Sequence, residues 1–198
     1  MKNKDEAFEL FTKENIPLFP IHGILENGDC TCKLGGNCLQ KGNHPFFENW
    51  SKMITTNINL CREWLPCLNY GIPTGTISKI VVVEVDRTND GSNSIGRLQH
   101  KLGLISTLRV NSDRDHFDLY YRYDDIFKLE VKLKNWKGIR VKAENDWVLG
   151  PYSQVSLNKF KIPDLGLNSG VLEFKSFSEL YPTSNEIYSL TDWREACI

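Results

Sequence analysis

The run at residues 80–86 predicts a strand that lies inside a sheet. It reads Ile-Val-Val-Val-Glu-Val-Asp and is apolar on both faces until its two acids appear. β-Branched residues favour strands, and a strand that is apolar on both faces is covered on both sides. Because burying charge is costly, Glu84 and Asp86 at the end of such a run indicate a functional role. The alternative is that the two acids pair with arginine or are solvated.

A second predicted strand repeats this pattern. His116 and Asp118 stand at the start of the strand that we expect at residues 117–123. Residues i and i+2 of a strand point to the same face, so each strand offers two metal-capable side chains to one side. If the strands are neighbours, the four side chains converge on one or two divalent cations, Mg²⁺ or Mn²⁺. Such cations neutralise a transferring phosphate, which makes these four residues our candidate catalytic residues.

The rest of the chain interleaves helices with strands. Its 198 residues are enough for one domain with a small appendage. We therefore expect the α/β or α+β class, with a mixed sheet and flanking helices. Residues 1–162 are the predicted domain, and residues 163–198 are a C-terminal extension that packs on it. Helices are predicted at 4–14, 55–67, 92–102 and 185–196, and further strands at 104–110, 138–141, 146–150 and 171–174.

A loop rich in Gly, Asn and Cys occupies residues 23–49, and it has little periodicity. A loop of this length inside a compact domain is usually functional or braced. Three thiols and one imidazole lie within its central part, residues 28–46, in the order Cys30, Cys32, Cys38 and His44. This set matches a closed Cys₃His structural zinc site, which would supply the cross-link that the loop lacks. The alternative is four free side chains on a flexible loop.

Charge and hydropathy limit the partners of the protein. The formal net charge is −1, so nucleic-acid binding would need a local basic patch. No apolar run reaches the length of a membrane span, and the N-terminus lacks a signal-peptide core. We expect a cytoplasmic protein with no membrane partner, in which reduced cysteines favour metal binding over disulfides.

Basic and aromatic residues alternate along the later strands. This mixture suits a nucleic-acid strand, through phosphate contacts and base stacking. The alternative is a half-exposed sheet with aromatic residues inward and charges outward. The basic residues that we expect to contact nucleotide or nucleic acid are Arg109, Arg114, Arg122, Arg140 and Lys142.

Several short motifs, taken in order, resemble a known family. They are Leu18-Phe19-Pro20-Ile21, Gly42-Asn43-His44-Pro45, Asn69-Tyr70-Gly71-Ile72-Pro73-Thr74-Gly75, the acidic strand, Leu119-Tyr120-Tyr121-Arg122 and Trp147-Val148-Leu149-Gly150-Pro151. Their order and spacing resemble the bifunctional DNA primase/polymerase (prim-pol) domain of the archaeo-eukaryotic primase superfamily, found in plasmid and phage replication proteins. The resemblance covers about residues 5–155.

The resemblance implies a catalytic core on a modified RNA-recognition-like sheet, and several motif positions depart from the family pattern. Glu84 and Asp86 fall on the acid-x-acid motif that organises metal and nucleotide. Asp118 stands where the family has His, and His116 lies two residues earlier on the same strand face. Arg140 replaces the Asp of the third motif. Since Arg cannot become a metal ligand, we expect it to pair with an acid in place of a cation.

Two function hypotheses follow. The preferred hypothesis is a prim-pol-like replication protein that binds nucleic acid or nucleotide and in which metal-dependent nucleotidyl transfer is weak or lost. The alternative is an active template-dependent primase/polymerase that uses metal bound by the acid-x-acid motif. The expected partners are single-stranded or primed DNA, nucleotides and a separate helicase. Contact between Arg140 and the acids would favour the first hypothesis, and an open acidic pocket would favour the second. A metal-dependent nuclease is a third class with similar carboxylates.

Overall fold

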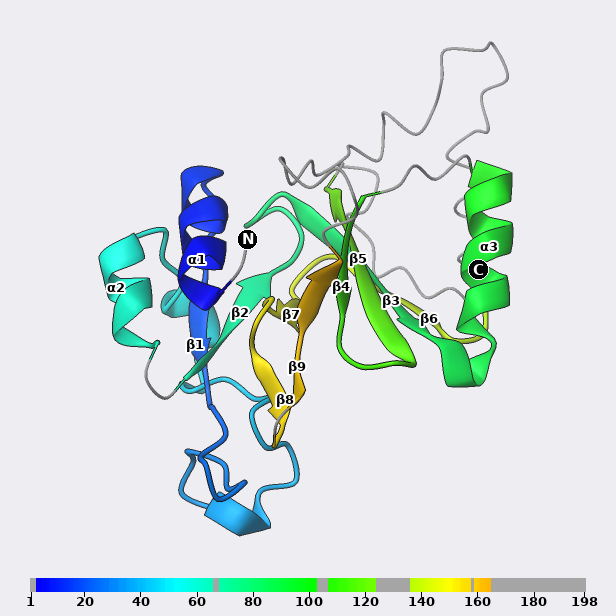
Figure 1. Cartoon of the computed structure of the whole chain (residues 1–198). Helices are drawn as coiled ribbons and strands as arrows, with labels where there is room; N and C mark the ends of the chain where they lie inside the picture. Colours follow the sequence, from blue (N-terminus) through cyan, green and yellow to red (C-terminus); the bar gives the residue numbers. More distant parts are fainter. Residues whose placement is uncertain (1–2, 66–67, 103–106, 124–135, 158, 165–198) are drawn as a thin grey trace. The chain divides into compact units, whose positions relative to one another are not determined.

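The computed structural model describes residues 3–65, 68–102, 107–123, 136–157 and 159–164 (Figure 1). The chain divides into two compact units. Unit 1 comprises Met1–Pro73 and Trp147–Pro163, and unit 2 comprises Thr74–Asp146 and Asp164–Ile198. The strand predicted at 171–174 and the helix predicted at 185–196 lie outside the described residues, as does nearly all of the predicted extension.

The described residues of unit 1 form two α-helices and a three-stranded antiparallel sheet. The sheet has the order β1-β2-β7. The elements of this unit are α1 (Lys4–Lys13), β1 (Phe19–Ile21), α2 (Ile58–Glu63), β2 (Asn69–Pro73), β7 (Trp147–Leu149), β8 (Gln154–Ser156) and β9 (Lys159–Phe160). Strands β8 and β9 form a short hairpin. A final strand, β10, covers Ile162–Asp164. Short 3₁₀ turns cover Gly35–Asn37 and Trp50–Lys52.

Capping residues define where the helices of unit 1 begin. The side chain of Asn3 accepts a hydrogen bond from the Glu6 N–H at the start of α1, and Asn57 caps α2 in the same way. Helix α2 is shorter than the helix predicted at 55–67, since Trp64 already stands at its C-cap. Arg62 of α2 bonds to Asp5 of α1, with Nε and Oδ1 2.6 Å apart, so the two helices are joined by an ion pair.

Within the described part of unit 2, the antiparallel strands β4, β5, β3 and β6 lie side by side in that order. Their bounds are β3 (Ile80–Asp86), β4 (Leu108–Asn111), β5 (His116–Arg122) and β6 (Ile139–Lys142). Strand β3 pairs with β5 on one side and with β6 on the other, which confirms it as an interior strand. The α+β class is also confirmed, because the described helices accompany sheets whose neighbouring strands pair antiparallel.

One face of the unit 2 sheet forms a hydrophobic core with α3 (Gly91–Leu102). Val81, Val83 and Val85 of β3 point to this face and lie in one cluster with Ile95 of α3. The 3₁₀ turn Arg87–Asn89 leads from β3 to Asp90, whose φ of 64° is left-handed, and α3 then begins at Gly91. The helix therefore begins one residue before the predicted start at residue 92. No helix in the described part of the chain is long and apolar enough to cross a membrane.

Candidate functional site

The register of unit 2 places the predicted acidic residues on one face of the sheet. Glu84 of β3 lies opposite Asp118 of β5, and Asp86 lies opposite His116. Directly opposed residues of antiparallel strands point to the same side, so all four share the face that lies away from α3. On the other flank of β3, Glu84 lies opposite Arg140 of β6. The residues thus form a row across the sheet in which acid, acid and base are neighbours.

Glu84 is surrounded by protein cations. The Nζ atom of Lys142 lies 3.5 Å from Glu84 Oε1 and 3.4 Å from Asp146 Oδ1. The guanidinium of Arg140 lies 3.9 Å from Glu84 Oε2 and 3.3 Å from Asp146 Oδ2. The Lys142 side chain is only 12% exposed, whereas that of Arg140 is 66% exposed. An ammonium held between two carboxylates in this way supplies the positive charge that a bound cation would supply.

Asp86 belongs to a second, separate network. Its Oδ1 atom accepts hydrogen bonds from the hydroxyl and the N–H of Thr88 and lies 3.4 Å from His116 Nε2. The hydroxyl of Thr88 is the main cause of a lowered Asp86 pKa. The other ring nitrogen of His116 lies 2.9 Å from Asp113 Oδ1, and this bond raises the pKa of the His116 imidazole. The imidazolium is therefore stabilised between two carboxylates.

Asp118, the third acid on this face, is buried, with 4% of its surface exposed. Glu84 and Asp86 have different protein cations beside them. Within the described ranges, only the Cys/His loop brings three or more Cys, His, Asp or Glu ligand atoms together. Glu84, Asp86 and Asp118 do not form such a group, and protein cations lie beside the carboxylate of Glu84.

The five predicted basic residues do not share one surface. Arg122, Arg140 and Lys142 lie on the face of the acids, as the register of β5 and β6 with β3 dictates. Arg109 lies on the opposite face, with its guanidinium 4.0 Å from the centre of an aromatic ring of β5. Arg114 lies in the turn between β4 and β5 and is exposed. A nucleic-acid strand on the acid face would therefore meet only the first three.

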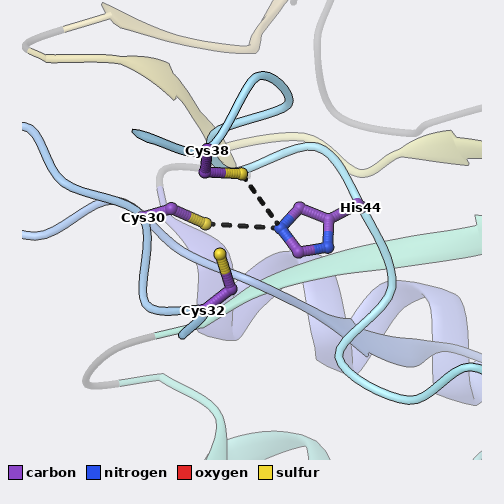
Figure 2. A group of neighbouring side chains, drawn as sticks. All are labelled: Cys30, Cys32, Cys38 and His44. Carbon is purple, nitrogen blue, oxygen red and sulfur yellow. Dashed lines mark hydrogen bonds between the residues drawn. The ribbon is translucent and has the colours of Figure 1, made fainter. Parts of the chain in front are cut away.

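The four predicted zinc ligands converge in unit 1 (Figure 2). Their ligand atoms all lie within 4.8 Å of one another. His44 Nε2 lies 3.4 Å from the sulfur of Cys30 and 3.5 Å from that of Cys38. Sulfur and nitrogen ligands of a tetrahedral zinc ion, bonded at about 2.3 Å and about 2.0 Å, lie about 3.5 Å apart. The donor set and its spacing fit zinc, and the four residues could hold this ion.

Hydrogen bonds attach the zinc loop to the sheet of unit 1. The N–H of Phe46 donates to the Pro20 carbonyl, 3.1 Å away. The buried side chain of Asn69, on β2, donates from Nδ2 to the carbonyls of Gly42 and Gln154, both at 2.8 Å. The segment that ends in His44 is therefore attached to β1, β2 and β8.

Several residues of these sites are missing from the sequence-based predictions. Asp146 and Asp113 complete the two ion networks, yet both lie in turns next to strands, where acids are common. The i, i+4 spacing of Lys142 and Asp146 is a weak sign of an ion pair, because this spacing brings side chains together in helices. Here Lys142 is the last residue of strand β6, and Asp146 follows it. His22, which lies just before the zinc loop, and Thr31, which lies within it, form a contact that no sequence pattern indicates.

Comparison with known proteins gives a family match. Residues 7–161 match the family model described as the N-terminal domain of bifunctional DNA primase/polymerase. This range covers most of unit 1, residues 74–146 of unit 2, and both candidate sites. No curated protein matches the chain.

Proposed function

The chain belongs to the bifunctional DNA primase/polymerase family, and from this membership we propose that it is a replication protein that binds nucleic acid, with nucleotidyl transfer weak or lost. The proposed ligands are single-stranded or primed DNA and nucleotides. Metal-dependent transfer would need Glu84 and Asp86 to hold a divalent ion that neutralises the charge of the triphosphate.

The pairing of Glu84 with Lys142 and Arg140 is the observation that carries this proposal. A divalent ion that approached Glu84 would meet two positive charges within 3.9 Å of its carboxylate oxygens. Repulsion at this range is strong at the partly buried position of Lys142. The same residues favour an anionic ligand, since the two-thirds exposed Arg140 can donate to a phosphate beside its acidic partners.

We also propose that zinc binds Cys30, Cys32, Cys38 and His44 as a structural ion. All four positions are filled by protein ligands in this arrangement, which leaves none for a reacting water. The ion would cross-link a segment that contains a single short 3₁₀ turn, Gly35–Asn37. The proposed role of zinc is therefore to hold the shape of unit 1.

Two measurements on the same protein test this function. Primer extension and de novo priming on single-stranded DNA are assayed with Mg²⁺ or Mn²⁺, and binding of labelled single-stranded DNA is followed by fluorescence anisotropy. We expect no product but measurable, salt-dependent binding. Arg140→Gln should weaken binding and reduce the salt slope by about 1, whereas Lys13→Gln, which removes a charge from α1 in unit 1, should leave both unchanged.

The alternatives predict other results. Product from the wild-type protein that disappears in Asp86→Ala would establish an active primase/polymerase. A protein with neither product nor binding would remove the nucleic-acid interpretation and direct the search to a protein partner.

A further inference from the structure

His22 contacts the segment that carries the fourth zinc ligand. It follows directly after β1, and its backbone N–H donates to the carbonyl of His44, 3.0 Å away. The two imidazole rings also lie against each other, with centroids 4.5 Å apart and planes tilted by 34°. The ring of Phe46 lies 4.8 Å from the ring of His22. His44 is thus fixed by one hydrogen bond and one ring contact from the same residue.

His22 also contacts the first two ligands, through Thr31. Thr31 is the single residue between Cys30 and Cys32, and its Oγ1 atom lies 2.8 Å from Nδ1 of His22. The same hydroxyl oxygen accepts a hydrogen bond from the N–H of Gly23 at 3.0 Å, and the Thr31 N–H donates to the Gly23 carbonyl at 3.1 Å. The Cys-x-Cys turn is therefore attached to residues 22 and 23 by three contacts.

We propose that His22 and Thr31 are positioning residues that set the relative placement of Cys30, Cys32 and His44 for the metal. This inference rests on the zinc site proposed above. His22 is not itself a ligand, because its ring nitrogen Nδ1 is engaged with Thr31 and its ring does not belong to the converging set.

The physical reason is the cost of ordering the loop. Without attachment, the cysteine turn and the His44 segment must find each other when the ion binds, and the lost chain entropy lowers affinity. Residues that orient metal ligands from outside the coordination sphere typically change metal affinity by about 10–100-fold. His22 contacts both parts of the ligand set from the end of β1, so its loss should act on metal binding more than on folding.

The test uses the full chain and variants that remove single contacts. Thr31→Val deletes the hydroxyl and keeps the shape, and His22→Phe keeps the ring contact but removes Nδ1. Zinc affinity is measured by competition with a chromophoric chelator. The ligand field is read from the visible absorption of the Co²⁺ protein. Thermal unfolding is recorded with and without chelator.

We expect each variant to lose about 10-fold or more in zinc affinity, with little change in the melting temperature of the metal-free protein. The double variant should lose no more than the stronger single variant, because the two residues act through one contact. Thr31→Ser, which restores the hydroxyl, should restore affinity. Thr12→Val, which removes a hydroxyl from α1 in the same unit, should leave zinc affinity unchanged.

The inference would be overturned if both variants bound zinc with wild-type affinity. It would also be overturned if the metal-bound and metal-free forms were destabilised equally, and His22 and Thr31 would then have a purely structural role. A wild-type protein that binds neither zinc nor Co²⁺ at four ligands would instead refute the zinc site itself.

Discussion

His116 and Lys142 each place one positive charge between two carboxylates. His116 lies between Asp86 and Asp113, and Lys142 lies between Glu84 and Asp146. Each acid of the acid-x-acid motif therefore has its own protein cation. These pairs are partly exposed, so each contributes little to stability, and their main effect is on which ions and ligands the face accepts.

The titration of His116 gives a prediction at this scale. Its pKa should lie above the ordinary value of about 6.5. The stabilisation from the imidazolium is then complete below about pH 6.5 and is lost as the pH rises through the higher folded-state pKa. Asp113→Asn, which removes the largest cause of the shift, should lower the pKa toward 6.5 and flatten this pH dependence. The measurement is an NMR titration of the ring protons together with urea unfolding at several pH values.

Asp115→Asn is the matched control, because Asp115 lies one residue from His116 but has the smallest named effect on its pKa. An equal shift in both variants would mean that general surface charge, and not the bond to Asp113, raises the pKa.

At the scale of single elements, two glycines of α3 have opposite surroundings. A Cβ atom at Gly91 would lie 2.3 Å from the Asp86 carbonyl oxygen and 2.7 Å from that of Gly138, whereas at Gly96 it would meet no atom within 4 Å. Gly91→Ala should therefore destabilise the protein by about 1–3 kcal/mol. Gly96→Ala should stabilise it by about 0.5–1 kcal/mol through helix propensity. Urea denaturation of both variants measures the two changes.

The pair serves as its own control, since the same substitution is made twice in one helix. If both substitutions destabilised the protein, the result would contradict this packing of α3. Of the two glycines, only Gly91 lies close to Asp86 at the end of β3 and to Gly138 just before β6.

The elements differ in how well the sequence predicts them. Strand β3 and the α1 helix were predictable, because the β-branched run of the first and the apolar stripe of the second are local patterns that extend over several residues. The zinc ligands were predictable for a similar reason, since all four lie within one short segment. The hairpin of β8 and β9 was missed because its strands are two or three residues long. The partners of Glu84 could not be predicted, because the register of β6 on β3 depends on contacts across the sheet.

At the scale of the whole molecule, zinc removal should affect one unit. All four proposed ligands, together with the residues that anchor their loop, belong to unit 1. After treatment with a chelator, amide hydrogen exchange of the loop and of β1 should accelerate by at least about tenfold, equal to about 1.4 kcal/mol of lost protection. Exchange in β3 and β5 of unit 2 should stay the same. Hydrogen exchange followed by mass spectrometry measures both units together.

Cys38→Ser should reproduce the pattern without chelator. Acceleration that spread equally through both units would contradict the assignment of the ion to unit 1 alone.

Unit 1 is formed by two separate stretches of the chain, and this affects how it folds during synthesis on the ribosome. Strand β2 receives β1 as a neighbour early, but its other neighbour, β7, begins only at Trp147, after all of the β3–β6 segment has been translated. At 5–20 residues per second, this delay lasts roughly 4–15 s. During that time β2 has an unpaired edge that can pair with other nascent chains. Translation speed across residues 74–146 should therefore influence how much of the protein reaches its native state.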